Sequence, residues 1–296
     1  MRLVAWRGEQ SNFGDELNHI IWPRLLPDFF DSDPSSIFLG IGSLLDCRHP
    51  RSALKIVAGS GFGGYERPAS IDQTWVMHWV RGPLTARMVG LPDKWGIGDP
   101  GSLVCCIDGV RNAAGSDIGF MPHFETLGRS DWRRVADLAG MRLIDPTSPV
   151  RETLTELMRC RVLIGEALHG VIVADALRIP WIAIQPMAAV HRMKWLDWAG
   201  AMGITLRRHP LTRASCWEWV STSRVVGSGR TMKVLSAFER RLRSACRSSL
   251  EMRAAESLAR LASVEPQLSS DHALDRSLER MMAKIERIRC DPFASA

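Results

Sequence analysis

The amino-acid sequence predicts an α/β protein in which two doubly wound, Rossmann-like domains face a cleft and a helical C-terminal extension follows them. Over the first two-thirds of the 296 residues, short apolar runs alternate with helical patterns and Gly-rich turns, which is typical of parallel sheets. A small, polar stretch at 107–117 interrupts this alternation and is typical of a linker. We therefore expect an N-terminal domain at 1–110, a second domain at 118–230 and the extension at 231–296.

The N-terminal domain is expected to contain buried strands that each end in a polar or glycine-rich turn. The apolar runs are 3–6, 36–43, 54–61 and 74–80. The helical pattern ELNHIIWPRLL follows the first run. RGPLTARMVG predicts a second helix, with Pro83 in its first turn and Gly90 at its end.

The second domain repeats this alternation. The expected strands are DIGFM, MRLID, RVLIGE and WIAIQP, and the expected helices are WRRVADLAG, SPVRETLTELMRC and HGVIVADALRI. Ser148 or Thr147 is placed to cap the middle helix, and Glu152 in its first turn suits the helix dipole. Two such series joined by a linker predict two similar sheets.

The extension is helical, amphipathic and rich in arginine. Between residues 240 and 260 the sequence has Arg at 240, 241, 243, 247, 253 and 260, against Glu at 251 and 256. This segment is either a solvated helix face packed on the core or a helix that contacts an anionic membrane or a partner.

The overall charge narrows the class of partner. A net charge of +6 and a pI of about 9.2 indicate nucleic acid, a membrane surface or a phosphorylated substrate. Nucleic acid is disfavoured because Lys is scarce and the sequence has no helix-turn-helix, zinc-finger or RNP-type pattern. The seven Cys have no zinc-site spacing, so we expect free thiols and no metal. Without a signal-peptide pattern or a long apolar segment, we expect a cytoplasmic protein.

Polar residues directly after the predicted strands mark the candidate site, because ligands of open α/β sheets bind beyond the carboxyl ends of the strands. These residues are Asn12, Gly14, Asp15, Ser60, Arg81, His123, Glu166, His169, Gly170, Arg192 and Lys194. Cations, histidines and acids that converge from both halves indicate an anionic substrate and proton transfer.

The segment 161–184 is the most informative. A buried strand turns sharply into a helix whose first turn carries His169 and Gly170, and glycine there lets a ligand approach the backbone. The free N–H groups of a helix N-terminus suit a phosphate or carboxylate. We expect Glu166 to lie close enough to orient His169 or to tune its proton affinity.

The motifs NFGDELN, GIGSLL, GSGFGG, VRGPLT, GDPGSL, the Pro-His pair, EALHGVIVADALRIPW and HRMKWLDW, in this order, resemble the polysaccharide pyruvyltransferase family. Over roughly residues 1–200 the chain is most similar to the ketal-pyruvyltransferases of bacterial exopolysaccharide synthesis, of the succinoglycan type. The resemblance implies a GT-B-like fold. It also implies transfer of pyruvate from phosphoenolpyruvate to two hydroxyls of a sugar, without a cofactor. The implied acceptor is a lipid-linked oligosaccharide at the inner face of the inner membrane.

By position, the family's motifs place donor-binding residues at Arg81 and His123 and the C-terminal histidine at His169. Many members have Arg where this chain has Ala167, so we expect Lys194 or Arg192 to bind the phosphate instead, with Gly170 nearby.

Ketal formation requires protonation of the enol carbon and deprotonation of each attacking hydroxyl. His169 is the expected general acid, supported by Glu166, and Asp15 is a candidate base. Asn12, Gly14 and Ser60 are expected on the acceptor side.

Other functions remain open at this point. A nucleotide-sugar-dependent GT-B glycosyltransferase would bind a diphosphate at the same strand-to-helix turn, 166–170. A non-catalytic sugar-binding or nucleic-acid-binding protein is a further alternative.

Overall fold

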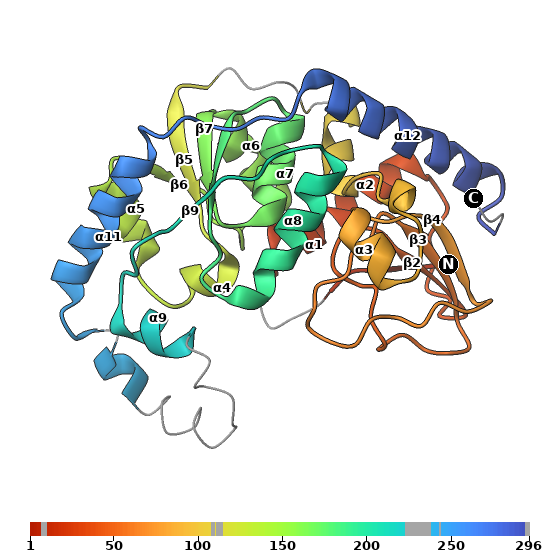
Figure 1. Ribbon diagram of the computed structural model, residues 1–296, viewed down its shortest axis with the longest axis horizontal. Coiled ribbons are helices and arrows are strands. Elements are labelled where there is room, and N and C mark those ends of the chain that lie inside the picture. Colours follow the sequence, from red (N-terminus) through yellow and green to blue (C-terminus); the bar gives the residue numbers. More distant parts are fainter. Residues whose placement is uncertain (7–10, 108–109, 111–114, 223–237, 243, 294–296) are drawn as a thin grey trace.

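The computed structural model describes residues 1–6, 11–107, 110, 115–222, 238–242 and 244–293, and it contains two parallel sheets flanked by helices (Figure 1). Part of the expected linker at 107–117 lies outside the described residues. The expected boundary between the second domain and the extension, near 231, lies outside them as well.

The first sheet has four parallel strands in the order β1-β2-β3-β4. Their bounds are β1 (Arg2–Val4), β2 (Ser36–Leu39), β3 (Leu54–Ala58) and β4 (Trp75–Trp79). The helices of this half are α1 (Phe13–Glu16), α2 (Asn18–Leu25), α3 (Pro83–Met88), η1 (Asp93–Trp95) and η2 (Pro100–Cys106). All four strands were expected, but their order never reverses within the described part of this sheet. The doubly wound prediction is therefore wrong for these four strands.

The second sheet has five parallel strands in the order β6-β5-β7-β8-β9, which does reverse. Its strands are β5 (Asp117–Met121), β6 (Arg142–Leu143), β7 (Cys160–Gly165), β8 (Trp181–Ile184) and β9 (Arg208–His209). The helices are α4 (Phe124–Leu127), α5 (Trp132–Leu138), α6 (Val150–Met158), α7 (Leu168–Ala176), η3 (Ala189–His191), α8 (Arg192–Ala201) and α9 (Cys216–Ser221). The reversal falls between β5 and β7, and a ligand site is expected at that point.

Helix α7 joins the two halves. Eight of its nine residues are buried, because an almost wholly apolar sequence favours burial on every side. It packs against β7 and β8 of its own sheet and against α1 and η2 of the first half. The N-terminus of α7 therefore lies where the two halves meet.

The extension packs on both halves. Helix α11 (Arg247–Leu261) buries Ala254, Ala255 and Leu258 and lies against α5. Helix α12 (Asp271–Cys290) returns to the first half, beside β4 and η2 (Figure 1). There the Ser277 hydroxyl donates to the Ile97 carbonyl over 2.9 Å. In the part of the chain that the structure describes, no helix is both long and apolar enough to cross a bilayer.

Candidate functional site

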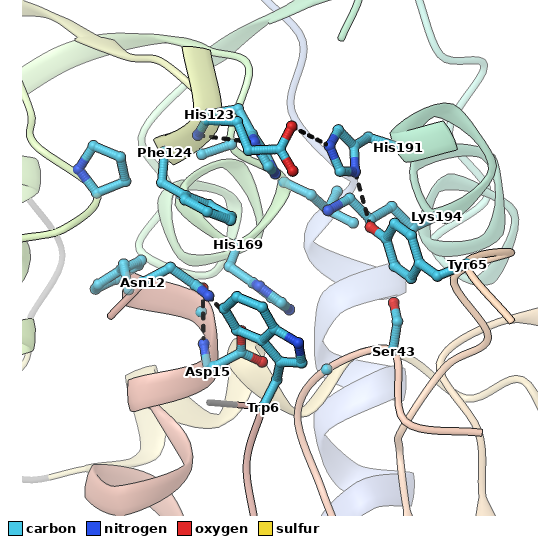
Figure 2. Close-up of a pocket in the computed structure, with 18 of the residues that line it drawn as sticks. Trp6, Asn12, Asp15, Ser43, Tyr65, His123, Phe124, His169, His191 and Lys194 are labelled. Carbon is cyan, nitrogen blue, oxygen red and sulfur yellow. Dashed lines mark hydrogen bonds and ion pairs between the residues drawn. The ribbon is translucent and has the colours of Figure 1, made fainter. Parts of the chain in front are cut away.

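A cavity of about 320 Å³ lies between the two halves, beyond the carboxyl ends of both sheets (Figure 2). The first half supplies polar and aromatic side chains from the ends of its strands and from α1, and the second half supplies histidines, an acid and a lysine. The polar and aromatic lining residues are Trp6, Asn12, Phe13, Asp15, Ser43, Arg48, Tyr65, His123, Phe124, Glu125, His169, His191 and Lys194.

His169 stands in the first turn of α7, and both halves hold its ring. Its Nε2 lies 3.5 Å from Oδ2 of Asp99, a fully buried residue of the first half. On the other side the ring lies against α1, where a Cβ on Gly14 would be 1.8 Å from Nδ1. Glycine at position 14 is therefore required for this close approach.

Asp15 lies beside His169 at the start of α1. Asn12 caps this helix by accepting from the Asp15 N–H over 3.2 Å, and its side-chain amide donates to the Asp15 carboxylate (Figure 2). Burial raises the pKa of Asp15, although His169, Asn12 and Lys194 act in the opposite direction. A carboxylate with a raised pKa, next to a histidine, suits proton transfer.

Two histidines and a lysine of the second half form the opposite wall. The rings of His123 and His191 stack with centroids 4.1 Å apart, and Lys194 lies close to them. Burial, together with Arg81, lowers the pKa of Lys194 to about 8. Burial lowers the pKa of His123 well below its ordinary value, and Lys194 and His191 add to this effect. A bound anion would favour the protonated forms of both groups.

Hydrogen bonds from both halves fix the orientation of His191. Its Nδ1 lies 2.8 Å from the Tyr65 hydroxyl, and its Nε2 lies 3.3 Å from Oε2 of Glu125. Arg129 also pairs with Glu125, over 2.9 Å. Burial tends to raise the pKa of Glu125, but His191 and Arg129 outweigh it and lower that pKa to about 2. The sequence reasoning missed Tyr65 and Glu125, although Glu125 follows the Pro-His pair by two residues.

Several predicted site residues lie where expected. Asn12, Gly14, Asp15, His123, His169, Gly170 and Lys194 all line the cavity. Ala167, which stands where many family members have arginine, lines the cavity as well. These residues therefore lie together at the cavity between the two halves.

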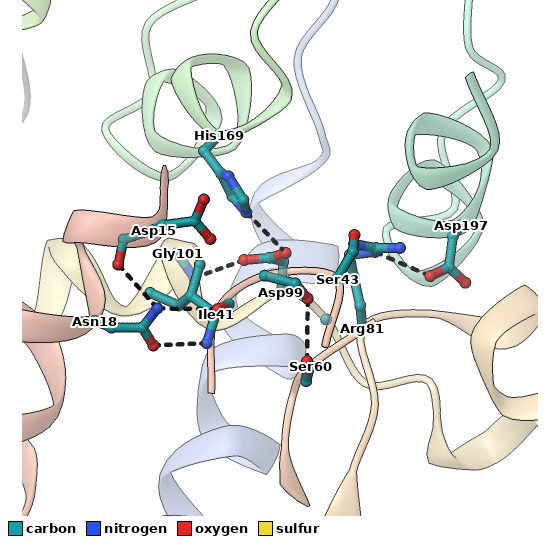
Figure 3. A network of polar contacts seen from close by, with 12 residues as sticks. Asp15, Asn18, Ile41, Ser43, Ser60, Arg81, Asp99, Gly101, His169 and Asp197 are labelled. Atoms are coloured by element: carbon teal, nitrogen blue, oxygen red, sulfur yellow. Dashed lines mark hydrogen bonds and ion pairs between the residues drawn. The ribbon is translucent and has the colours of Figure 1, made fainter. Parts of the chain in front are cut away.

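Arg81 lies outside the cavity lining. Its side chain is 1% exposed and donates to Asp197 over 3.0 Å, to the Ser43 hydroxyl over 3.1 Å and to the Phe62 carbonyl over 2.8 Å (Figure 3). Asp197 belongs to α8 of the second half, so the pair joins the halves. Because Arg81 is engaged in this buried salt bridge, its expected contact with the donor stays a prediction.

Glu166 was expected to orient His169, but its carboxylate binds other groups. Its carboxylate accepts from the backbone N–H groups of His123 and Met187, over 3.0 and 2.9 Å, and from Thr126 over 3.1 Å. All of these partners belong to loops and α4, so Glu166 fixes the His123 loop. The carboxylate that faces Nε2 of His169 is that of Asp99.

Ser60 and Arg192 also lie outside the lining. The Ser60 hydroxyl donates to the Gly42 carbonyl and accepts from the Leu44 N–H, which holds a loop in place. Arg192 donates to the Pro186 carbonyl over 3.4 Å. Of the two residues expected to replace the family's arginine, the structure brings only Lys194 to the cavity.

One cluster in the wall has the residue types of a metal site. Donor atoms of His123, Glu125 and His191 lie within 4.8 Å of one another. However, Lys194 and Arg129 act electrostatically on the same groups, and nearby positive charge opposes a cation. His123 Nδ1 also accepts from the Glu125 N–H.

The fold and the site define an α/β protein with a polar cavity between two parallel sheets. The sequence profile of the family described as polysaccharide pyruvyl transferase matches residues 86–186. The chain is also 32% identical, over 320 residues, to the succinoglycan biosynthesis protein ExoV of Rhizobium meliloti (strain 1021), covering 99% of this chain and 100% of that relative. The chain therefore belongs to the polysaccharide pyruvyl transferase family and is a polysaccharide pyruvyltransferase, as the resemblance implied.

No solved structure matches the chain. Family membership decides among the functions that the sequence left open, in favour of pyruvyl transfer over glycosyl transfer or simple binding.

Proposed function

We propose that the enzyme transfers the pyruvyl group of phosphoenolpyruvate to two hydroxyls of one sugar in an exopolysaccharide precursor. The observation that carries this proposal is the cavity between the halves, where His169 and Asp15 face Lys194 and the two stacked histidines. The succinoglycan biosynthesis relative supports an exopolysaccharide acceptor.

The reaction balances without an oxidant, a reductant or a cofactor. C3 of phosphoenolpyruvate gains a proton, and each hydroxyl oxygen forms a bond to C2 and loses its proton. The bond between C2 and the phosphate oxygen breaks, and phosphate leaves with the electron pair. One hydroxyl proton balances the proton gained by C3, and the other leaves with hydrogen phosphate. We propose that the enzyme needs no bound metal for these steps.

The donor fits the positive wall. Lys194, His123 and His191 supply charge or hydrogen bonds to the phosphate and carboxylate of a trianionic molecule. The first turn of α7, which includes Gly170, adds N–H groups and a favourable dipole. Arg81 acts from behind this wall, through its electrostatic effect on Lys194.

The acceptor fits the opposite side. We propose that His169 protonates C3, that Asp15 accepts a hydroxyl proton, and that Asn12 and the Gly14 backbone position the sugar. Trp6 is 37% exposed at the cavity, 6.0 Å from the Phe124 ring, and offers a flat surface for a sugar ring.

We further propose a GT-B-like arrangement of the two halves. The return of α12 from the second half to the first supports this proposal, as does a cavity between two parallel sheets. The acceptor is proposed to be lipid-linked and to be reached at the cytoplasmic face of the inner membrane, with exposed arginines of 240–260 near the lipid.

Product analysis tests the proposed function. The enzyme is incubated with phosphoenolpyruvate and lipid-linked or free oligosaccharides, and proton NMR is used to look for the methyl singlet of a pyruvyl ketal. We expect this signal together with stoichiometric phosphate release, and we expect both to be absent with His169→Ala. Turnover of a nucleotide sugar without ketal formation would overturn the proposal.

A further inference from the structure

Asp99 is a buried carboxylate whose two oxygens have different surroundings. Residue 99 is fully buried and caps η2, where its Oδ1 accepts from the Gly101 N–H over 2.8 Å. Its Oδ2 faces His169 Nε2 at 3.5 Å (Figure 3). Within the described residues, neither of these two facing atoms has a hydrogen-bond partner.

Because Asp99 is buried, its carboxylate needs a hydrogen-bond donor from the protein. An ionised carboxylate oxygen without a partner in the protein interior is costly, so Oδ2 requires a donor. The group opposite is Nε2 of His169, at a distance that a small ring rotation would shorten to a hydrogen bond. Burial tends to raise the pKa of Asp99, but His169, Arg81 and the Gly101 N–H lower it on balance, so the carboxylate is ionised at neutral pH.

The other ring nitrogen of His169 faces a different environment. Nδ1 lies on the Gly14 side of the ring, close to Asp15 and the cavity. One edge of the imidazole therefore points into the protein toward Asp99, and the other points toward the place where the reactants are proposed to bind.

We propose that Asp99 is a positioning residue that accepts the Nε2–H of His169 and leaves Nδ1 to exchange protons with the reactants. This inference rests on the proposed function for its role in catalysis. In the proton-transfer step the imidazolium gives its Nδ1 proton to C3, a C–H bond forms from the enol π electrons, and the neutral ring keeps its proton on Nε2. Asp99 stays ionised throughout and stabilises the imidazolium.

The arrangement also explains why the site requires both halves. His169 belongs to α7 of the second half, while Asp99 precedes η2 of the first. Because α7 packs on η2, the docking of the two halves brings the histidine to its carboxylate.

The substitution Asp99→Asn gives a specific test, because Gly101 fixes the direction of the new amide. The Gly101 N–H needs an acceptor, so the amide oxygen stays on that side and the amide NH₂ faces His169 Nε2. Nε2 must then accept, and the proton moves to Nδ1. The variant therefore favours the opposite tautomer while it keeps the helix cap.

The experiment is ¹⁵N NMR of the histidine rings in the full-length enzyme without substrates, with the His169 signals assigned by their loss in His169→Gln. We expect the Nε2–H tautomer in the wild type and the Nδ1–H tautomer in Asp99→Asn. We also expect kcat for ketal formation to fall by about 10²-fold or more, with little change in KM for phosphoenolpyruvate. Asp175→Asn, a buried aspartate at the far end of α7, is the matched control and should keep the wild-type tautomer.

A wild-type His169 with its proton on Nδ1 would overturn the inference even if Asp99→Asn did not fold. An unchanged tautomer in Asp99→Asn would overturn it as well. Because these spectra are recorded without substrate, they are independent of the proposed function, which fails separately if no ketal forms.

Discussion

At the scale of single residues, the surroundings of Lys194 in the cavity set the pKa of its amine. Lys194 is half-buried, and burial together with Arg81 lowers its pKa to about 8, although Asp15, Glu125 and Glu166 act in the opposite direction. A bound trianionic donor would favour the protonated amine. Binding of the donor and uptake of a proton by Lys194 are therefore coupled.

This coupling predicts the alkaline limb of the pH profile. Lys194 is protonated below pH 8 and loses its charge as the pH rises through that value. We expect kcat/KM for phosphoenolpyruvate to be level below about pH 8 and to fall up to tenfold per pH unit above it. Lys194→Arg should remove this fall because arginine stays charged. Lys194→Met should lower kcat/KM about 10- to 100-fold at neutral pH.

Lys94→Met is the matched control, because Lys94 is exposed and lies outside the cavity lining. It should reproduce the wild-type profile in steady-state kinetics measured from pH 6 to 10. An alkaline limb that persists in Lys194→Arg would assign the titration to another group.

The residue scale also shows where sequence reasoning was sufficient. His169 and Lys194 follow strands, and the convergence of strand ends is a general property of parallel sheets. The partner of His169 was not predictable in this way. Glu166 is only three residues away along the chain, but its carboxylate is directed to backbone N–H groups, while Asp99 reaches the ring from the other half.

At the scale of elements, the strands were predictable because both faces of a parallel sheet are buried and the sequence shows unbroken apolar runs. The two-residue strand β9 was missed because both of its residues, Arg208 and His209, are polar and form no apolar run. The amphipathic pattern predicted the helices of the extension. It could not predict that α11 covers α5 and that α12 covers the first half, since an apolar face does not specify which surface it will meet.

Helix α11 leaves arginines available for the proposed membrane contact. Its apolar residues face α5, and Arg247 pairs with Asp131 and Glu251, but Arg253 and Arg260 are exposed. Each basic residue near an anionic membrane contributes about 1 kcal/mol. We therefore expect the double variant Arg253→Gln/Arg260→Gln to bind anionic vesicles about 30-fold more weakly than the wild type at low salt.

Vesicle sedimentation at low and high salt measures this effect. The control variant Arg51→Gln/Arg67→Gln removes two exposed arginines from the first half and should bind like the wild type. Binding that is insensitive to salt, or equal on neutral vesicles, would contradict an electrostatic contact.

At the scale of the whole molecule, the site exists only because the two halves are held in register. The Arg81–Asp197 pair is fully buried and links the loop after β4 to α8. Thr85 adds two further contacts to Asp197, from its N–H over 2.9 Å and from its hydroxyl. From the sequence, Arg81 was expected to contact the donor. Only the packing of α8 on α3 shows that Asp197 is its partner.

This network predicts that Arg81 contributes mainly to stability. Arg81→Met leaves the carboxylate of Asp197 buried without its cation, which should lower the free energy of unfolding by about 3–5 kcal/mol. Arg81→Met/Asp197→Leu, which removes both charges, should recover most of that loss. Urea unfolding measures both effects. Arg87→Met, which breaks an exposed pair with Asp93, should have no measurable effect.

The same variant separates a structural role from donor binding. Because Arg81 lies behind the cavity wall, the folded Arg81→Met protein should still show a rise in melting temperature with phosphoenolpyruvate, whereas Lys194→Met should show little or none. If Arg81→Met had the wild-type free energy of unfolding but lost the rise in melting temperature with phosphoenolpyruvate, the guanidinium would contact the donor directly. That result would require the halves to move apart when the donor binds, since the guanidinium is enclosed by Asp197, Ser43 and Phe62 in the structure described here.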